Sequence, residues 1–562
     1  MIIGAKEAPL FWSGVARRMH YDRIEDQDTT GGGMDAYDYI VVGGGSAGCT
    51  VTHRLVKAGK SVLMIEAGPN DDNQFVRIPG GFVRLFATER VQFYLSEPQA
   101  AAGHRPVAVP QGRTLGGGSS VNAMIYIRGA PQDYDEWRAM GCAGWGWDDV
   151  LPAFKRAEAN QRFAGPLHGT EGPLSVSDLR YRHPLSLAGL RAAQEAGYAY
   201  NDDFNGLSQQ GVGFYQVTQR DAERGSAAST YLRAVVGDSR LKVMTDASVG
   251  KLLTENGAAA GVAIADKSGA ATEARAREEV ILAAGALATP KILQLSGIGP
   301  AEHLASLGIA VVRDAPEVGN NFQDHLDVPF YIQVREPISL LGEDRGLKAA
   351  RHYLQYKLFR TGLLCSNVVE AGGFIDTTGS GRSDIQIHFI PQLLGDPPRE
   401  GPPGHGLSIN PAILDPKSRG IVRLRSPNPA EAILFDPKFL SAPEDIAAFV
   451  RGIKVARKIG GQPSLQRLGA VEISPLGEPL MQSDAEMGEH ARHYAKSIYH
   501  PVGTCRMGSD DKAVVDPTLK VRGVPRLRIC DASVMPKIPR GNTNAPTIMI
   551  AERCADFILA GR

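Results

Sequence analysis

The chain places a short apolar run directly before a glycine-rich turn in Asp38-Tyr39-Ile40-Val41-Val42-Gly43-Gly44-Gly45-Ser46-Ala47-Gly48-Cys49. Residues 39–42 are apolar and mostly β-branched, which is typical of a strand buried on both faces. The glycines that follow have a G-x-G-x-x-G spacing. The first allows a tight turn, the second lets a pyrophosphate approach the backbone, and the third lets a helix pack on the strand.

A helix and a second strand follow in the order that a dinucleotide site needs. The predicted helix, residues 47–58, would point its free amide groups at a phosphate. The second strand ends at Glu66, about 20 residues after the glycines, where a carboxylate can bind ribose hydroxyls. This order favours a dinucleotide site over a purely structural βαβ turn. The predicted ligand contacts are Gly43, Gly45, Ser46, Ala47, Gly48, Glu66 and Ala67.

Length and composition limit the class of protein. With 562 residues the chain exceeds the size of a single core, about 250–300 residues, so we expect at least two lobes. Lys plus Arg (61) balances Asp plus Glu (61), which removes the electrostatic case for binding nucleic acid. The six cysteines form no C-x-x-C pair, so we expect reduced thiols, no metal site and a cytoplasmic location, with peripheral association with a membrane as the alternative.

Neither end of the chain adds a membrane signal. No run approaches about 18 consecutive apolar residues, so we expect no transmembrane segment. Residues 1–33 end in Thr29-Thr30-Gly31-Gly32-Gly33 and have the composition of a flexible extension. Arg17-Arg18 resembles a twin-arginine signal, but the polar residues 20–30 stand where an apolar segment would be needed.

A second glycine-rich segment reads Gln111-Gly112-Arg113-Thr114-Leu115-Gly116-Gly117-Gly118-Ser119-Ser120-Val121-Asn122. Its N–H and hydroxyl donors suit a backbone that lies against a planar or phosphorylated ligand. The same composition fits a flexible surface loop.

This segment, continued to Gly129 and Trp137, resembles the first signature of the glucose–methanol–choline (GMC) flavoprotein oxidoreductases. Residues 285–300 resemble the second signature, and 318–325 and 499–508 match two further family motifs. The last of these reads Tyr499-His500-Pro501-Val502-Gly503-Thr504-Cys505-Arg506-Met507-Gly508. The motifs run in family order from about residue 35 to 560 and are most similar to choline-dehydrogenase-like bacterial alcohol dehydrogenases.

The resemblance implies an α/β fold with two discontinuous domains. One is a Rossmann-like FAD-binding domain made of residues 34–165, 222–325 and 496–562. The other is a substrate domain made of 166–221 and 326–495, built on an antiparallel sheet with helices. Local patterns agree, since 241–249, 279–284, 384–389, 420–425 and 527–530 read as strands and 444–459 as a helix. A final helix is expected from Thr547 onward.

The resemblance also identifies two candidate catalytic residues. By itself His500 is most simply a histidine satisfied by a carbonyl, but the motif around it matches the active-site histidine of the family. An imidazole, with a pKa of about 6.5, can remove the alcohol proton as hydride leaves for flavin N5. Asn544, in Gly541-Asn542-Thr543-Asn544, matches the second family position. Its amide can orient the alcohol but cannot accept the proton, and an asparagine that only stabilises a turn is the alternative.

The family implies further contacts with the cofactor and the substrate. Glu370 matches a glutamate that contacts the cation in choline oxidases, although many relatives with neutral substrates carry it too. The expected FAD contacts outside the first loop are Arg113, Leu115, Gly116, Gly117, Ser120, Asn122, Ala123, Met124, Ile125, Val249, Ala284, Gly285, Asp531, Ala532, Asn542, Thr543, Asn544 and Thr547.

Two departures from family patterns carry predictions. Members with covalent FAD have a histidine where this chain has Val109, and His104 is out of register, so we predict non-covalent FAD. The four tryptophans, Trp12, Trp137, Trp145 and Trp147, lie outside the predicted substrate domain, which disfavours choline as the substrate. Tyr and Phe side chains remain an alternative source of an aromatic cage.

The sequence therefore predicts FAD-dependent oxidation of an alcohol, most simply a primary alcohol or a sugar or polyol CH–OH group. A quinone or an artificial dye would accept the electrons. An oxidase that reduces O2 to H2O2 has the same motifs. A lyase or decarboxylase that keeps FAD without net redox chemistry, and a flavoprotein used only for binding, also remain open.

Overall fold

Strand β1 (Tyr37–Val42) forms the centre of a parallel sheet. The computed structural model describes residues 36–395 and 401–562, so the predicted extension of residues 1–33 lies outside the described residues. Residues 40–42 of β1 are fully buried, as their apolar side chains require. The parallel strands, in spatial order, are β10 (Leu241–Met244), β2 (Val62–Ile65), β1, β13 (Ala271–Leu282) and β25 (Leu527–Ile529).

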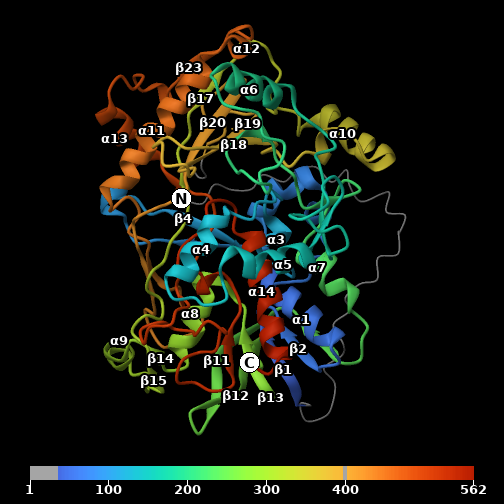
Figure 1. Ribbon diagram of the computed structural model, residues 1–562, viewed down its shortest axis with the longest axis vertical. Coiled ribbons are helices and arrows are strands. Elements are labelled where there is room, and N and C mark those ends of the chain that lie inside the picture. The colour runs from blue at the N-terminus through green and yellow to red at the C-terminus, as the bar shows by residue number, and fades with distance from the viewer. Residues whose placement is uncertain (1–35, 396–400) are drawn as a thin grey trace.

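Helices leave this sheet at one edge. Helix α1 (Ser46–Lys57) follows β1, α8 (Gly285–Leu295) follows β13, and α14 (Asn544–Leu559) lies beyond β25. Because all three begin near the carboxyl ends of parallel strands, their N-termini gather at the edge where α/β sheets bind ligands. Figure 1 shows α1 and α14 side by side, although about 500 residues separate them.

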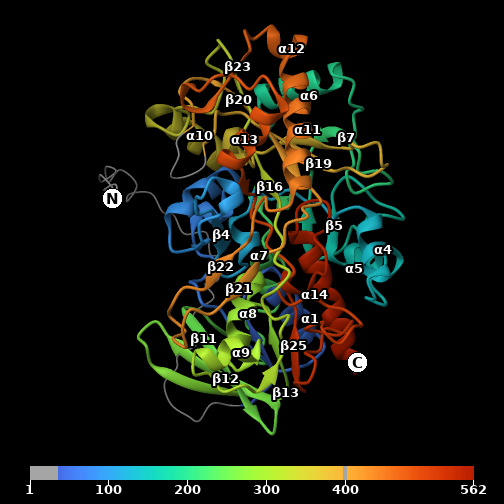
Figure 2. The same cartoon turned by 90° about the vertical axis from the view of Figure 1, so that its left-hand side faces the viewer.

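A second sheet, entirely antiparallel, forms the other lobe at the top of Figures 1 and 2. Helices α6 (Pro184–Glu195) and α11 (Pro443–Gly460) pack against it, and α13 (Asp484–Tyr494) packs on α11. The predicted fold class is confirmed. In spatial order, the strands of this antiparallel sheet are β23 (Val471–Ile473), β17 (Tyr331–Gln333), β20 (Gly406–Ile413), β19 (Ile385–Ile390), β18 (Ala371–Ile375) and β7 (Gly211–Phe214). Strand β16 (Leu326–Asp327) pairs with β20, and β24 (Lys496–Ser497) pairs with β16.

Further elements complete the described fold. They include α2 (Gln74–Arg77), the 3-10 helix η1 (Pro79–Ala87), the hairpin of β3 (Val91–Leu95) and β4 (Ala108–Gly112), α3 (Gly118–Val121), α4 (Pro131–Ala139), α5 (Trp147–Ala157) and α10 (Gly346–Phe359). All six cysteines are buried. Among the described residues, no helix is long and apolar enough to cross a membrane.

Two predicted elements differ from those observed. The strand predicted over 241–249 divides at Asp246, whose φ of 51° turns the chain out of the parallel sheet into β11 (Ala247–Glu255). Strand β11 then forms an antiparallel meander with β12 (Ala258–Asp266) and β13. The last helix begins at Asn544 rather than Thr547, because Pro546 is compatible with a first helical turn.

Candidate active site

A cavity of about 3390 Å³ extends from the carboxyl edge of the parallel sheet into the antiparallel lobe. Pockets for one small molecule are usually about 300–1,000 Å³. This cavity therefore has room for a dinucleotide together with a second ligand.

The first glycine loop has the geometry of a phosphate cradle. Gly43 has a φ of 107°, and a Cβ there would overlap the carbonyl of Ala283. A Cβ on Gly48 would overlap the carbonyl oxygen of Gly43, so α1 can approach β1 this closely only with glycine at this position. Helix α1 has no side-chain cap, which leaves its first N–H groups available to an anion at the cavity.

Glu66 is held at the end of β2 by the same loop. Its two carboxylate oxygens accept hydrogen bonds from Gly44 N at 2.8 Å and from Gly68 N at 2.9 Å. Burial raises the pKa of Glu66 to about 7, and the two N–H donors oppose that shift. Each oxygen retains a lone pair for a hydroxyl, as binding to a ribose requires.

Asp531 connects β25 to α8. Its Oδ2 accepts from Gly285 N at 2.8 Å and from Thr289 Oγ1 at 2.6 Å, and its Oδ1 accepts from Ser533 N at 2.8 Å. The carboxylate therefore orients two chain segments that both line the cavity, Asp531–Ala532 and Ala284–Gly285.

Asn122 is fixed by an arginine from a distant part of the chain. Its Oδ1 accepts from Arg224 Nη1 at 2.7 Å and from Met124 N at 2.9 Å. Arg224 also donates to the carbonyls of Ser119 and Val76, and its burial lowers its pKa to about 9. Sequence reasoning missed Arg224, because nothing near residue 224 indicates a contact with residue 122.

His500 belongs to a chain of hydrogen bonds whose direction can be derived. His325 Nε2 lies 3.2 Å from the carbonyl of Leu414, which can only accept, so His325 Nε2 carries the proton and its Nδ1 is an acceptor. His500 Nδ1, 3.1 Å from His325 Nδ1, must then be the donor. The remaining lone pair of His500 lies on Nε2, where it accepts a hydrogen bond from Asn542 Nδ2 at 3.2 Å.

Surrounding groups keep His500 neutral and in place. Burial, with a smaller contribution from His388, lowers the pKa of His500 to about 3. Its backbone N donates to Asp324 Oδ1 at 2.8 Å, and Asp324 Oδ2 accepts from Ser497 Oγ. The sequence analysis quoted Asp324 and His325 within a family motif but gave them no role. The histidine that ends the motif of residues 318–325 was the available signal.

Asn542, just before α14, and Asn544, its first residue, point to different parts of the cavity. Asn542 contacts the imidazole of His500, whereas Asn544 Oδ1 accepts a hydrogen bond from Ser46 Oγ at 2.7 Å. The structure thus brings His500 together with Asn542 and brings Asn544 to the phosphate loop.

Most other sequence-predicted residues line the cavity. The buried residues Leu115, Gly116, Ser120 and Gly48 lie behind the lining, where Gly116 N donates to Gly44 O at 2.7 Å. The predicted residues that line the cavity are Gly43, Gly45, Ser46, Ala47, Glu66, Ala67, Arg113, Gly117, Asn122, Ala123, Met124, Ile125, Val249, Ala284, Gly285, His500, Asp531, Ala532, Asn542, Thr543, Asn544 and Thr547.

Glu370 lies outside this lining. Its carboxylate is buried and accepts from His183 N at 2.6 Å and from Ser366 Oγ at 2.5 Å. Glu370 therefore contacts His183 and Ser366 and does not face the cavity.

A buried ion pair lines the cavity instead. Asp327 and Lys496 face each other on the β16–β24 ladder, with Lys496 Nζ 3.4 Å from Asp327 Oδ1. Asn410 Nδ2 donates to the other oxygen of Asp327 at 2.9 Å. The sequence analysis gave these residues no role.

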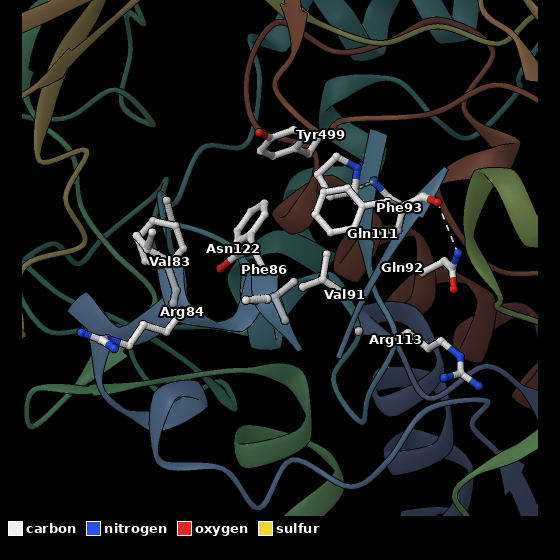
Figure 3. Close-up of a pocket in the computed structure, with 18 of the residues that line it drawn as sticks. Val83, Arg84, Phe86, Val91, Gln92, Phe93, Gln111, Arg113, Asn122 and Tyr499 are labelled. Atoms are coloured by element: carbon white, nitrogen blue, oxygen red, sulfur yellow. Dashed lines mark hydrogen bonds between the residues drawn. The ribbon is translucent and has the colours of Figure 1, made fainter. Parts of the chain in front are cut away.

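Aromatic rings form another part of the cavity wall. The ring of Phe86 is 5.9 Å from Tyr499 and 6.3 Å from Phe93, centre to centre. Figure 3 shows these rings with Val83 and Val91 around the cavity. Trp137 and Trp145 are fully buried elsewhere, so no described tryptophan lines this wall.

Comparisons with known proteins show which proteins the chain is similar to. Models of the GMC oxidoreductase family match residues 37–327 and 416–551. The chain is 44% identical to an alcohol dehydrogenase (acceptor) of Pseudomonas putida over 532 residues, covering 93% of this chain and 96% of that protein. It is 38% identical to the mitochondrial choline dehydrogenase of Homo sapiens, with coverage of 93% and 90%. Among solved structures, pyridoxine 4-oxidase from Mesorbium loti is similar, with a TM-score of 0.84, 29% identity and coverage of 93% and 99%.

Proposed function

Because the chain belongs to the GMC oxidoreductase family and is an FAD-dependent enzyme that oxidises alcohols, we propose that it converts an uncharged primary alcohol to the aldehyde and passes the electrons to a quinone-type acceptor. The glycine cradle, Glu66 and the uncapped start of α1 fit the pyrophosphate and ribose of FAD. When bound, the flavin supplies the hydride acceptor.

His500 is the proposed base. The single observation that carries this role is the hydrogen-bond order from Leu414 O through His325, which leaves the lone pair of His500 on Nε2. The lowered pKa keeps that nitrogen unprotonated until it takes the alcohol proton. Asn542, whose amide nitrogen is 3.2 Å from Nε2, is suited to donate to the alcohol oxygen while the proton leaves.

The test is anaerobic flavin reduction by a panel of primary alcohols in His500→Ala. We expect the variant to keep FAD and to lose about 10²–10⁴-fold in the rate of flavin bleaching. His104→Ala, a change at an exposed histidine outside the cavity, is the matched control and should bleach normally. A His500→Ala enzyme that bleaches at the wild-type rate would remove this residue from the mechanism.

FAD is proposed to be dissociable. Val109 is fully buried in β4 and has no atom that can bond to a flavin, while His104 is exposed outside the cavity lining. Acid precipitation should therefore release all the yellow flavin into the supernatant. Flavin that stays with the pellet after denaturation would contradict the proposal.

An uncharged substrate is favoured by the cavity wall. The Lys496 ammonium lies in the wall beside Asp327, so a choline cation near this pair meets a like charge as well as the carboxylate. We expect 1-hexanol to reduce the flavin at least about tenfold more efficiently (kcat/KM) than choline. The double variant Asp327→Asn/Lys496→Met removes the like charge and should narrow this preference. Choline as the better substrate would refute the assignment.

A dehydrogenase is favoured over an oxidase by the relative from Pseudomonas putida, which is named for an acceptor, whereas similar solved structures include several oxidases. Peroxide formed per alcohol oxidised in air separates the two. A yield near one would establish the oxidase. The buried, unpaired cysteines support a reducing compartment, and we propose the cytoplasm.

A further inference from the structure

Helix α10 carries leucines on the face that turns away from the protein. Leu347 is 90% exposed, Leu354 57% and Leu358 70%. Since a helix turns about 100° per residue, these positions lie within roughly 40° of one another and form one ridge. The opposite face is anchored, because the Tyr356 hydroxyl donates to the carbonyl of Ala222 at 3.0 Å.

Cations flank this leucine ridge. Residues 340–360 contain five Lys or Arg side chains and two acids. Glu343 is shared by Lys348, at 2.6 Å, and Arg351, at 3.8 Å, and both cationic side chains are more than half exposed. The ridge therefore carries an excess of positive charge along its sides.

The ridge also lies at an opening of the cavity. Leu354 is exposed to solvent and lines the cavity at the same time. The other α10 residues in the lining are Gly346, Ala349, Ala350, His352, Tyr353 and Lys357. Figures 1 and 2 both show α10 at the outer edge of the molecule, beside the second lobe.

We propose that α10 docks this protein on the surface of an anionic phospholipid bilayer, with the cavity opening next to the lipid. Single exposed leucines are ordinary, but an apolar ridge flanked by Lys and Arg is the pattern of helices that lie in a membrane interface. The anionic headgroups would face Lys348 and Arg351, and the leucines would enter the boundary with the acyl chains. An alcohol or an electron acceptor dissolved in the bilayer then reaches the opening directly.

Docking is tested without reference to activity, by co-sedimentation of the full-length, FAD-loaded protein with vesicles. One set is pure phosphatidylcholine, and the other contains about one quarter phosphatidylglycerol. We expect binding to the anionic vesicles that weakens as salt is raised. Leu347→Ser/Leu358→Ser should reduce the partition coefficient by about tenfold or more. Lys348→Gln/Arg351→Gln should reduce it for anionic vesicles only.

Leu207→Ser is the matched control, because Leu207 is 95% exposed but lies in another part of the chain, outside the cavity lining. It should bind like the wild type. All variants change exposed side chains outside the cavity and should keep their flavin absorbance. Absence of vesicle binding by the wild type, or unchanged binding by Leu347→Ser/Leu358→Ser, overturns the proposal. A lower molecular mass of this variant than of the wild type in lipid-free solution also overturns it, because the ridge would then be a contact between two copies.

Discussion

Asn542 and Asn544 stand two residues apart, yet their side chains serve different parts of the cavity. Asn542→Ala removes the amide beside His500, and we expect flavin reduction to slow by about 10–100-fold with FAD retained. Asn544→Ala removes the acceptor for Ser46 in the phosphate loop, so it should weaken FAD retention. The rate of flavin reduction in the enzyme that still holds FAD should not change. Stopped-flow absorbance and flavin content measure the two effects. If Asn544→Ala instead slowed flavin reduction and Asn542→Ala weakened FAD retention, the alcohol-binding role would belong to Asn544.

The pKa of His500 predicts an unusual pH dependence. The base must be neutral, so activity is lost as pH falls through its pKa, and burial lowers that pKa to about 3. We therefore expect the rate of flavin reduction to stay flat from about pH 8 to pH 5. An ordinary imidazole with a pKa of about 6.5 would lose about thirtyfold over this range. A decline centred near pH 6.5, in enzyme that still holds its FAD, would contradict the geometry.

Without the family resemblance, individual site residues could be predicted only along one continuous segment. Gly43, Gly45 and Glu66 follow from the βαβ pattern, because spacing along one continuous segment fixes their positions. Side-chain direction at the junction before α14 does not follow from spacing. Asn542 and Asn544 differ in what they face because helix α14 begins between them.

At the scale of elements, the packing of α1 on β1 depends on one glycine. In Gly48→Ala the new methyl group overlaps the carbonyl of Gly43, so α1 must move outward. We expect a loss of about 1–3 kcal/mol in the free energy of unfolding and a reduced FAD content. Urea unfolding and the ratio of flavin to protein absorbance measure these changes.

Gly461→Ala is the control for this substitution. Its φ is −79°, and a Cβ there would lie 3.7 Å from the carbonyl oxygen of Arg457, an ordinary van der Waals distance. It should change stability little, since surface substitutions usually stay within about 0.5 kcal/mol. Equal stability of Gly48→Ala and the wild type would show that α1 does not need its close approach to β1.

The elements themselves were largely predictable, because buried parallel strands and amphipathic helices have distinct patterns. Strand β1 and helices α1 and α11 lie within a few residues of their predicted positions. The exception, the division of 241–249 at Asp246, comes from tertiary structure. The segment leaves one sheet and enters a meander with β12. Asp246, a residue type that tolerates a positive φ, is a weak local signal of that change.

At the scale of the whole molecule, the parallel sheet depends on stretches that lie far apart in the sequence. Strands β1, β13 and β25 are adjacent in space but about 240 residues apart in sequence, and each leads to a segment that lines the cavity. FAD should therefore hold these stretches together. Removing it should lower the melting temperature, since a ligand at about 1,000 times its Kd contributes about 4 kcal/mol.

Differential scanning fluorimetry of apoprotein titrated with FAD measures this stabilisation. The melting temperature should rise with FAD concentration and return to the value of the holoenzyme. AMP, which lacks the flavin and one phosphate, is the control and should stabilise less. An apoprotein as stable as the holoenzyme would mean that the three stretches are held by protein contacts alone.

The burial of all six cysteines has a practical chemical consequence. Benzoquinones arylate thiolates, and burial raises the pKa of Cys49, Cys142, Cys365 and Cys505, so these sulfurs stay protonated and shielded. The enzyme should thus survive prolonged turnover in electrophilic oxidants that inactivate proteins with surface sulfhydryls.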